Sequence, residues 1–187
     1  MENHGDARET LIKLLREHSL VLGEVTLSSG KSATYYVDAR RTVMRPEGQR
    51  AAGELIAHHA KSLGASAVGG PVMAAIPLAC AAISVPEGAD LVGFFVRKER
   101  KEHGLQRWVE GGAEPGDRVL VVEDTVTTGG STISAIERIR DEGFEIAGVL
   151  SLVDRLVGGG EAIAAAAGAP YEALTTVDDV YPDRPDR

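Results

Sequence analysis

Two adjacent carboxylates, Glu123 and Asp124, stand between a run of apolar β-forming residues and a turn rich in hydroxyl groups and glycines. In a turn that opens a helix, unpaired backbone N–H groups and the helix dipole attract an anion. Ionised carboxylates only accept hydrogen bonds, so they suit hydroxyl groups or a hydrated magnesium ion. The pattern predicts a site for a ribose phosphate. The residues expected to hold the phosphate are Thr125, Val126, Thr127, Thr128, Gly129, Gly130 and Ser131.

The turn differs from two common nucleotide-binding motifs. It lacks the Gly-Lys-Ser/Thr ending whose lysine reaches the outer phosphates of a nucleoside triphosphate. It also lacks the three spaced glycines of a dinucleotide-binding loop. A single phosphate group is therefore the predicted ligand of the turn.

A second cluster that could do chemistry is the basic run from Arg97 to Arg107. It holds five Arg or Lys and two Glu, a local charge of +3 in a chain whose net charge is −8. Such a run is often a solvated surface loop. Here the strand before it is expected to end at the same sheet edge as the phosphate turn, so a diphosphate is a suitable ligand.

The elements that must position these residues alternate between strand and helix from Pro46 onward. This order predicts a doubly wound, mainly parallel α/β sheet flanked by helices, with its site beyond the carboxyl ends of the strands. A helix over 6–18 and strands over 25–30 and 33–41 precede it. We expect one domain, with residues 1–45 as a cap and 46–187 as the core. The core strands are expected at 67–70, 91–96, 118–123, 145–154 and 171–177, and its helices after Pro46, around 76–84, over 131–143 and after 158–160.

Composition narrows the class of protein. The 187 residues are 43% hydrophobic and 4% aromatic, typical of a globular domain with an aliphatic core. A net charge of −8 argues against a surface that binds nucleic acid. No secretory signal is visible, and no apolar stretch approaches the ~20 residues of a membrane helix. We therefore expect a cytoplasmic protein that binds neither membrane nor nucleic acid, with its one cysteine, Cys80, buried in the core.

The segment 119–132 resembles the motif of type I phosphoribosyltransferases that binds 5-phosphoribosyl 1-diphosphate (PRPP). The resemblance implies that Glu123 and Asp124 hold the ribose 2′- and 3′-hydroxyls, while the turn holds the 5′-phosphate. The motif leaves the acceptor base open.

The spacing of the basic run resembles the catalytic loop of the orotate phosphoribosyltransferases, which contacts the pyrophosphate of PRPP and closes over the neighbouring subunit of a homodimer. The resemblance extends to most of the chain, including LSSGKSATYYVDARR, GGPVMAAIPLA and SLVDR. The residues it implies as catalytic and PRPP-binding in the loop are Arg97, Lys98, Lys101 and His103.

The same resemblance implies the acceptor contacts. Arg155 matches the arginine that grips the orotate carboxylate, and Thr127 matches a second orotate contact. Tyr35 and Tyr36 lie where family members cover the pyrimidine; Tyr36 is the expected ligand contact, although packing within the cap is an equally good interpretation of both. Two family lysines are missing, because this chain has Ser28 and Ala74 at their places.

The activity implied is transfer of the 5-phosphoribosyl group from PRPP to orotate, giving orotidine 5′-monophosphate and pyrophosphate. Magnesium is the implied cofactor; PRPP would carry it without a direct protein ligand, through water to Glu123 or Asp124. Two alternatives remain open. One is a phosphoribosyltransferase for a purine or another base, and the other is a non-catalytic regulator that senses PRPP or binds nucleic acid.

Overall fold

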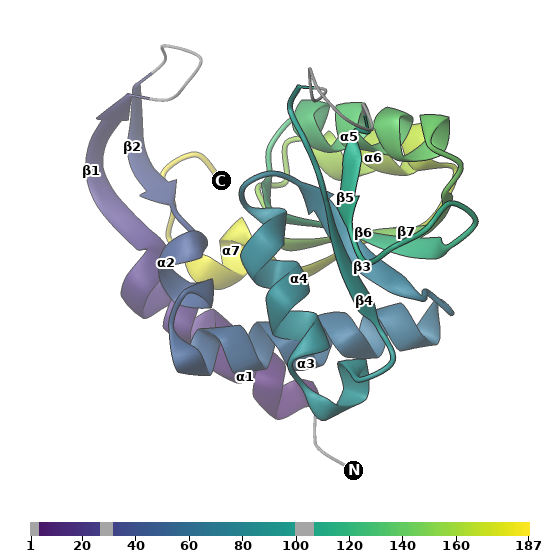
Figure 1. Ribbon diagram of the computed structural model, residues 1–187. Coiled ribbons are helices and arrows are strands. Elements are labelled where there is room, and N and C mark those ends of the chain that lie inside the picture. The colour runs from purple at the N-terminus through teal and green to yellow at the C-terminus, as the bar shows by residue number, and fades with distance from the viewer. Residues whose placement is uncertain (1–3, 27–31, 100–106) are drawn as a thin grey trace.

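A six-stranded sheet in the order β5-β4-β3-β6-β7-β8 forms the centre of the protein. The computed structural model describes residues 4–26, 32–99 and 107–187 (Figure 1). All neighbouring strands are parallel except β4 and β5. The strands are β3 Ala67–Pro71, β4 Val92–Val96, β5 Val109–Gly111, β6 Arg118–Val126, β7 Glu145–Asp154 and β8 Tyr171–Thr176. The predicted doubly wound, mainly parallel α/β fold is confirmed.

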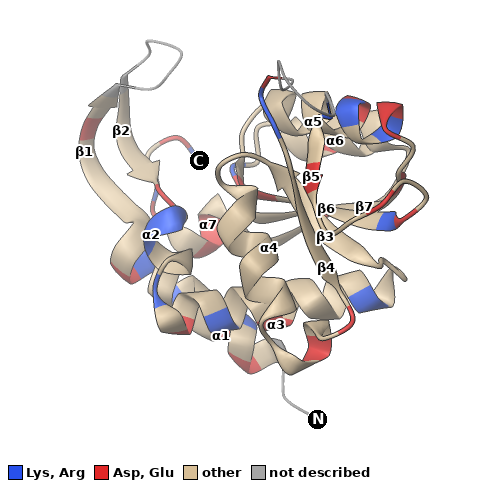
Figure 2. Cartoon of the chain, in the orientation of Figure 1, with Lys and Arg blue, Asp and Glu red and all other residues tan. Residues whose placement is uncertain are grey.

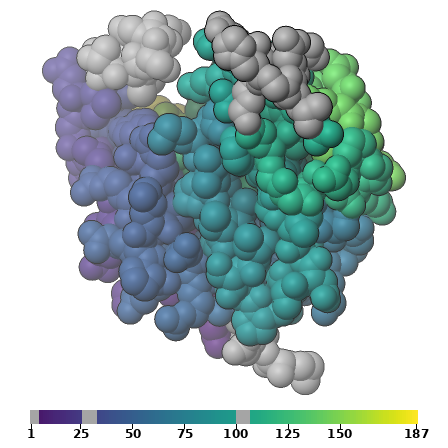
Figure 3. Space-filling model, viewed as in Figure 1, coloured from purple at the N-terminus to yellow at the C-terminus, as the bar shows by residue number. Residues whose placement is uncertain are grey.

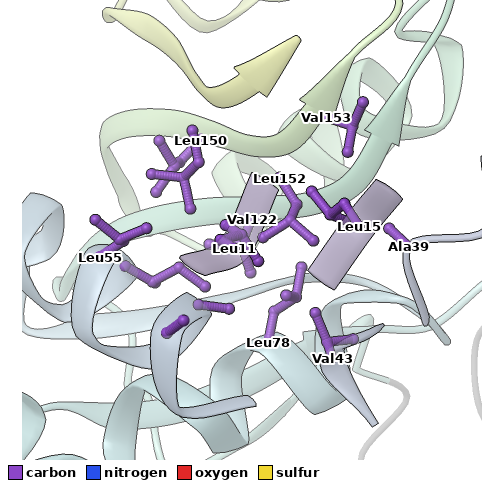
Figure 4. Close-up of a cluster of buried hydrophobic side chains, with 14 of the residues drawn as sticks. Leu11, Leu15, Ala39, Val43, Leu55, Leu78, Val122, Leu150, Leu152 and Val153 are labelled. Atoms are coloured by element: carbon purple, nitrogen blue, oxygen red, sulfur yellow. The ribbon is translucent and has the colours of Figure 1, made fainter. Parts of the chain in front are cut away.

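Helices cover both faces of this sheet because its strands alternate their side chains between two apolar clusters. On β6, Leu120 and Val122 join the cluster of α1, α3 and α4 (Figure 4), whereas Val119 and Val121 join that of α5 and α6. The helices are α1 His4–Leu14, α2 Arg40–Val43, α3 Pro46–Ser62, α4 Ala75–Ile83, α5 Gly130–Asp141, α6 Gly159–Ala167 and α7 Val177–Val180, with single turns of π-helix at Leu15–Ser19 and of 3₁₀-helix at Pro86–Gly88.

An antiparallel hairpin of β1 (Leu20–Thr26) and β2 (Ser32–Val37) makes a separate two-stranded sheet. It extends away from the central sheet, and the C-terminal segment lies between the two (Figure 1). The hairpin was predicted, but β1 begins at Leu20 rather than at 25, because Leu20 pairs with Val37. The second strand ends at Val37, since the following arginines form α2. Residues 27–31, which join the two strands, lie outside the described residues.

The N-terminal elements pack into the main core. Leu11 and Leu15 belong to the same buried cluster as Leu78 of α4 (Figure 4). Tyr35 and Val37 of β2 are members of this cluster as well. The base of the hairpin is thus fixed against the sheet by shared apolar contacts. This attachment matters for the site, because β2 brings its tyrosines to the carboxyl edge of the sheet.

One sequence prediction about local structure is wrong, and one strand was not predicted. Cys80 is exposed, because α4 is apolar on all sides but buries only one face, with Leu78 and Ala82, against the sheet. The strand that was not predicted is β5, whose three residues pair with β4. Within the described part of the chain, no helix has both the length and the apolar character to cross a membrane.

Candidate active site at the carboxyl edge of the sheet

Strand β6 carries the acidic pair inside the strand rather than at its end. The sequence pattern placed the strand end at Glu123, but pairing with β7 continues through Thr125 with Val153 and Val126 with Asp154. Side chains alternate along this extension. Glu123 therefore faces α5, and Asp124 faces the opposite side, where the field of Arg40 reaches it.

Glu123 braces the start of α5. Its carboxylate accepts hydrogen bonds from Ser131 Oγ at 3.2 Å and Thr132 Oγ1 at 3.0 Å. Burial, and next the charge of Asp124, raise the pKa of Glu123 to about 7. This carboxyl group can therefore gain or lose a proton near neutral pH.

Asp124 faces the cap. Thr125 N donates to its Oδ1 at 2.7 Å. Burial raises the pKa of Asp124, and this backbone hydrogen bond and the charge of Arg40 oppose the rise. The two adjacent carboxylates thus have different surroundings, one bound to the phosphate turn and the other close to the arginine of α2.

A polar cavity of about 130 Å³ lies over the turn after β6, lined by residues 125–132. Gly129 adopts a left-handed conformation, with φ of 79°, directly before α5, so the first N–H groups of α5 open toward this turn. The hydroxyl oxygen of Thr125 is buried and has no hydrogen-bond partner among the described residues. Such a cavity, with unpaired donors at a helix N-terminus, can hold a phosphate group.

Strand β7 brings Arg155 beside the same turn. Arg155 N donates to Val126 O at 3.0 Å, which places Arg155 next to Thr127. The Arg155 guanidinium forms no ion pair with the described residues; it donates from Nη2 to the hydroxyl of Tyr35 at 3.3 Å. The structure therefore brings together Thr127 and Arg155, two of the predicted acceptor contacts.

Of the two tyrosines in the hairpin, Tyr35 points to Arg155. Its buried ring lies 5.3 Å from the Arg155 guanidinium carbon. Tyr36, the predicted contact, is half-buried and lies on the other side of β2, because side chains alternate along a strand. The sequence interpretation missed the contact of Tyr35 with Arg155. The alternation of side chains along β2 shows that the two tyrosines point to opposite sides, but it does not show which of them faces Arg155.

Arg97 stands at the end of β4 and fixes the base of the basic loop. Its N–H donates to Trp108 O at 2.9 Å, and its Nη1 lies 3.0 Å from Glu110 Oε1. The exposed Lys98 follows it, and the arginine and lysine colour the end of β4 in Figure 2. Lys101 and His103, the other predicted loop residues, lie outside the described residues.

The sequence interpretation missed one residue near the acidic pair. The positive charge of Arg40 acts on Asp124, and this approach could not be predicted because it depends on how the cap packs on the sheet. Thr132 belongs to the predicted phosphate-binding motif, but its hydroxyl is wholly buried and donates to Glu123.

Comparison with known proteins gives matches over nearly the whole chain. A family model described as "Phosphoribosyl transferase domain" matches residues 46–166. Orotate phosphoribosyltransferase from Corynebacterium glutamicum ATCC 13032 is 44% identical over 177 residues, covering 95% of each chain. The orotate phosphoribosyltransferase of Streptomyces avermitilis is 44% identical over 177 residues, covering 94% of this chain and 97% of that protein.

Solved structures of similar proteins agree. The orotate phosphoribosyltransferase of Mycobacterium tuberculosis H37Rv, in complex with Fe(III) dicitrate, superposes with a TM-score of 0.85 at 42% identity. That match covers 94% of this chain and 99% of the other. The same enzyme in complex with PRPP superposes with a TM-score of 0.80 at 37% identity, covering 93% and 98%.

Proposed function

The chain belongs to the orotate phosphoribosyltransferase family, and from this membership we propose how its residues perform the family reaction. The protein transfers the 5-phosphoribosyl group from PRPP to orotate, giving orotidine 5′-monophosphate and pyrophosphate. One observation carries the assignment of the site. A polar cavity of about 130 Å³ at residues 125–132 lies beside the backbone of Arg155, and the guanidinium of Arg155 has no ion-pair partner among the described residues.

The donor would bind along β6 and α5. The turn, from Thr125 to Ser131, would hold the 5′-phosphate through N–H groups and hydroxyls, including the unpartnered hydroxyl of Thr125. Asp124 and Glu123 would accept hydrogen bonds from the ribose hydroxyls. In that arrangement Glu123 links the sugar to α5 through Thr132.

The acceptor would bind between Arg155 and Thr127. Guanidinium and carboxylate match in geometry and charge, so Arg155 would take the orotate carboxylate. Tyr36 would help to cover the ring. As orotate N1 bonds to the ribose carbon that pyrophosphate leaves, positive charge develops on the sugar ring and negative charge on the leaving group.

The basic loop would stabilise that leaving group. Arg97, Lys98, Lys101 and His103 would supply its positive charge and exclude water. Arg97 is held by Glu110 in this structure, so it would have to exchange that carboxylate for a phosphate oxygen. Because orotate is already an anion, the reaction needs no strong base, and His103 would at most give a proton to pyrophosphate.

Magnesium fits this donor set as an ion carried by the substrate. Within the part of the chain that the structure describes, no group of three metal-binding side chains exists, and the site offers the two carboxylates of Glu123 and Asp124. When bound, magnesium would neutralise charge on the diphosphate, with water between it and these carboxylates.

We also propose a cytoplasmic homodimer that shares the basic loop between subunits. In support, an apolar hollow of about 230 Å³ lies between α4 and β4. The residues of these two elements are coloured teal in Figure 3. Ile76, Cys80 and Ile83 line this hollow and are exposed. Since β4 leads directly into the loop, a partner subunit seated there would lie within reach of it.

A panel of acceptors tests the function. Pyrophosphate release is followed with magnesium and PRPP and with orotate, uracil, adenine or hypoxanthine. We expect turnover with orotate alone. Uracil lacks the carboxylate, so the comparison of uracil with orotate measures the contribution of the contact between this carboxylate and Arg155.

Arg155→Ala should raise the KM for orotate at least about a hundredfold, as loss of a charge-assisted pair costs about 3 kcal/mol. Arg50→Ala, on the exposed side of α3, is the control and should behave as wild type. Turnover with a purine and not with orotate would refute the proposal.

A further inference from the structure

The hydroxyl of Tyr35 lies between Arg155 and a carboxylate near the C-terminal end of the chain. Arg155 Nη2 is 3.3 Å from this oxygen, and Asp186 Oδ1 and Oδ2 are both 3.1 Å from it. The tyrosine is 2% exposed, and its carbon framework is packed in the core. Residues more than 100 positions apart in the sequence thus meet at one oxygen atom.

The hydrogen bonds at this oxygen can run in only one direction. A guanidinium only donates, and an ionised carboxylate only accepts. Although burial alone would raise it, hydrogen bonds from Arg184 and Tyr35 lower the pKa of Asp186, so this carboxylate is ionised at neutral pH. The single proton of the tyrosine therefore goes to Asp186, which leaves the lone pairs of the oxygen for the N–H of Arg155.

The segment that carries Asp186 is fixed to the fold at two points. Arg184, whose side chain is 10% exposed, contacts Asp178 Oδ1 of α7 at 2.6 Å and Asp186 Oδ1 at 3.0 Å. The ring of Tyr181 meets that of Tyr35 edge to face, with centroids 5.3 Å apart. The segment 178–186 is therefore held beside the hairpin, where Figure 1 shows the C-terminal end of the chain.

This arrangement suits a cation that must bind an anion from outside. A carboxylate placed directly on Arg155 would neutralise it, whereas a hydroxyl orients the guanidinium and leaves its charge available. The aromatic face of Tyr35 adds a second fixed contact. Asp186 orients the hydroxyl without touching Arg155, because no ion pair joins the two.

We propose that Asp186 is a positioning residue for the acceptor site, which acts on Arg155 through the hydroxyl of Tyr35. Through this contact the segment 178–186 contributes to the site that selects a base with a carboxylate. This inference rests on the proposed function, in which Arg155 binds the orotate carboxylate.

The test separates KM from kcat in a double-mutant cycle. Tyr35→Phe and Asp186→Ala should each raise the KM for orotate about fivefold, the effect of one hydrogen bond, with the KM for PRPP and kcat nearly unchanged. The double variant should be no worse than Tyr35→Phe alone, because the carboxylate acts only through the hydroxyl. Asp186→Asn keeps an acceptor oxygen and should recover most of the wild-type KM.

Asp183→Ala is the matched control, since it removes an exposed carboxylate from the same segment. It should leave the KM for orotate unchanged. An unchanged KM in Asp186→Ala, additive effects in the double variant, or an equal loss for PRPP and orotate would each overturn the inference. Those results leave the proposed function standing as long as the wild-type protein uses orotate and Arg155→Ala raises the KM for orotate as expected above. If the wild-type protein fails to use orotate, both proposals fall.

Discussion

Glu123 is the residue whose protonation should control binding of the donor. Its side chain is 5% exposed, and its pKa is raised to about 7 by burial and by Asp124. The ionised form accepts hydrogen bonds from a ribose hydroxyl, from Ser131 and from Thr132 at once, whereas the protonated form loses one accepting position. Binding of PRPP should therefore weaken as the pH falls through about 7.

The pH profile of kcat/KM for PRPP tests this prediction, since it reports ionisations of the free enzyme. Between pH 8 and pH 6 we expect a decrease with an apparent pKa near 7, the value for Glu123. Glu123→Gln, which cannot ionise, should have a lower value at pH 8 and should lose this step. PRPP titrates equally with both proteins, so a step that persists unchanged in Glu123→Gln would contradict the assignment.

Among the elements, β6 and β5 show where sequence patterns predict a strand and where they do not. The apolar runs predict β3, β4, β6 and β7 because burial between two layers of helices requires such residues. Near its end β6 is polar, from Glu123 to Thr125, and only the pairing of Thr125 and Val126 with β7 makes this part a strand. Strand β5 is short and stands in a charged run, so its pairing with β4 decides its structure.

For the candidate site, too, local sequence patterns predicted some parts and not others. Residues close in sequence, such as the acidic pair and the phosphate turn, could be grouped from their spacing. Contacts between distant segments could not. Arg155 reaches Thr127 through the register of β6 with β7, and Tyr35 reaches Asp186 because α7 turns the chain back toward the hairpin. These contacts depend on how elements pack, which no local pattern encodes.

The glycines at the start of α6 support the phosphate turn, and this predicts an effect at a distance from the ligand. A Cβ atom on Gly159 would overlap Thr127 O and the side chain of Val126. Gly159→Ala must therefore displace the turn, at a cost of about 2 kcal/mol for overpacking. We expect a KM for PRPP raised about tenfold or more and a lower midpoint of urea unfolding.

Ala165→Ser is the control for that variant, since Ala165 is exposed on the same helix. It should change neither quantity. A Gly159→Ala protein that is less stable but binds PRPP normally would mean that α6 supports the fold and not the phosphate turn.

At the scale of the whole molecule, the protein is acidic, but the arginines proposed to bind its anionic substrates lie together. The net charge is −8, yet Arg97 and Arg155 follow β4 and β7, two parallel strands that end at the same edge of the sheet. Sharing the loop between two subunits would place the charge of one chain over the acceptor site of the other. Whether a site is complete then depends on both chains.

Pairing of two inactive variants tests this arrangement. Lys101→Ala and Arg155→Ala are coexpressed with different affinity tags, and dimers that carry both tags are isolated. If the loop crosses to the partner, one of the two sites has both residues intact, so turnover should return to about half that of the wild-type dimer. If each chain uses its own loop, both sites are defective and turnover stays near that of the single variants.

A second dimer, in which one chain is wild type and the other carries both Lys101→Ala and Arg155→Ala, gives the opposite expectation. A wild-type chain joined to a chain with both substitutions has Arg155 in one site only, and the loop over that site comes from the substituted partner. A shared loop therefore predicts almost no turnover, whereas a self-contained subunit predicts about half. Because both dimers contain one Lys101 and one Arg155, only the path of the loop can make their activities differ. Failure of the two tags to copurify would show that the chains do not associate.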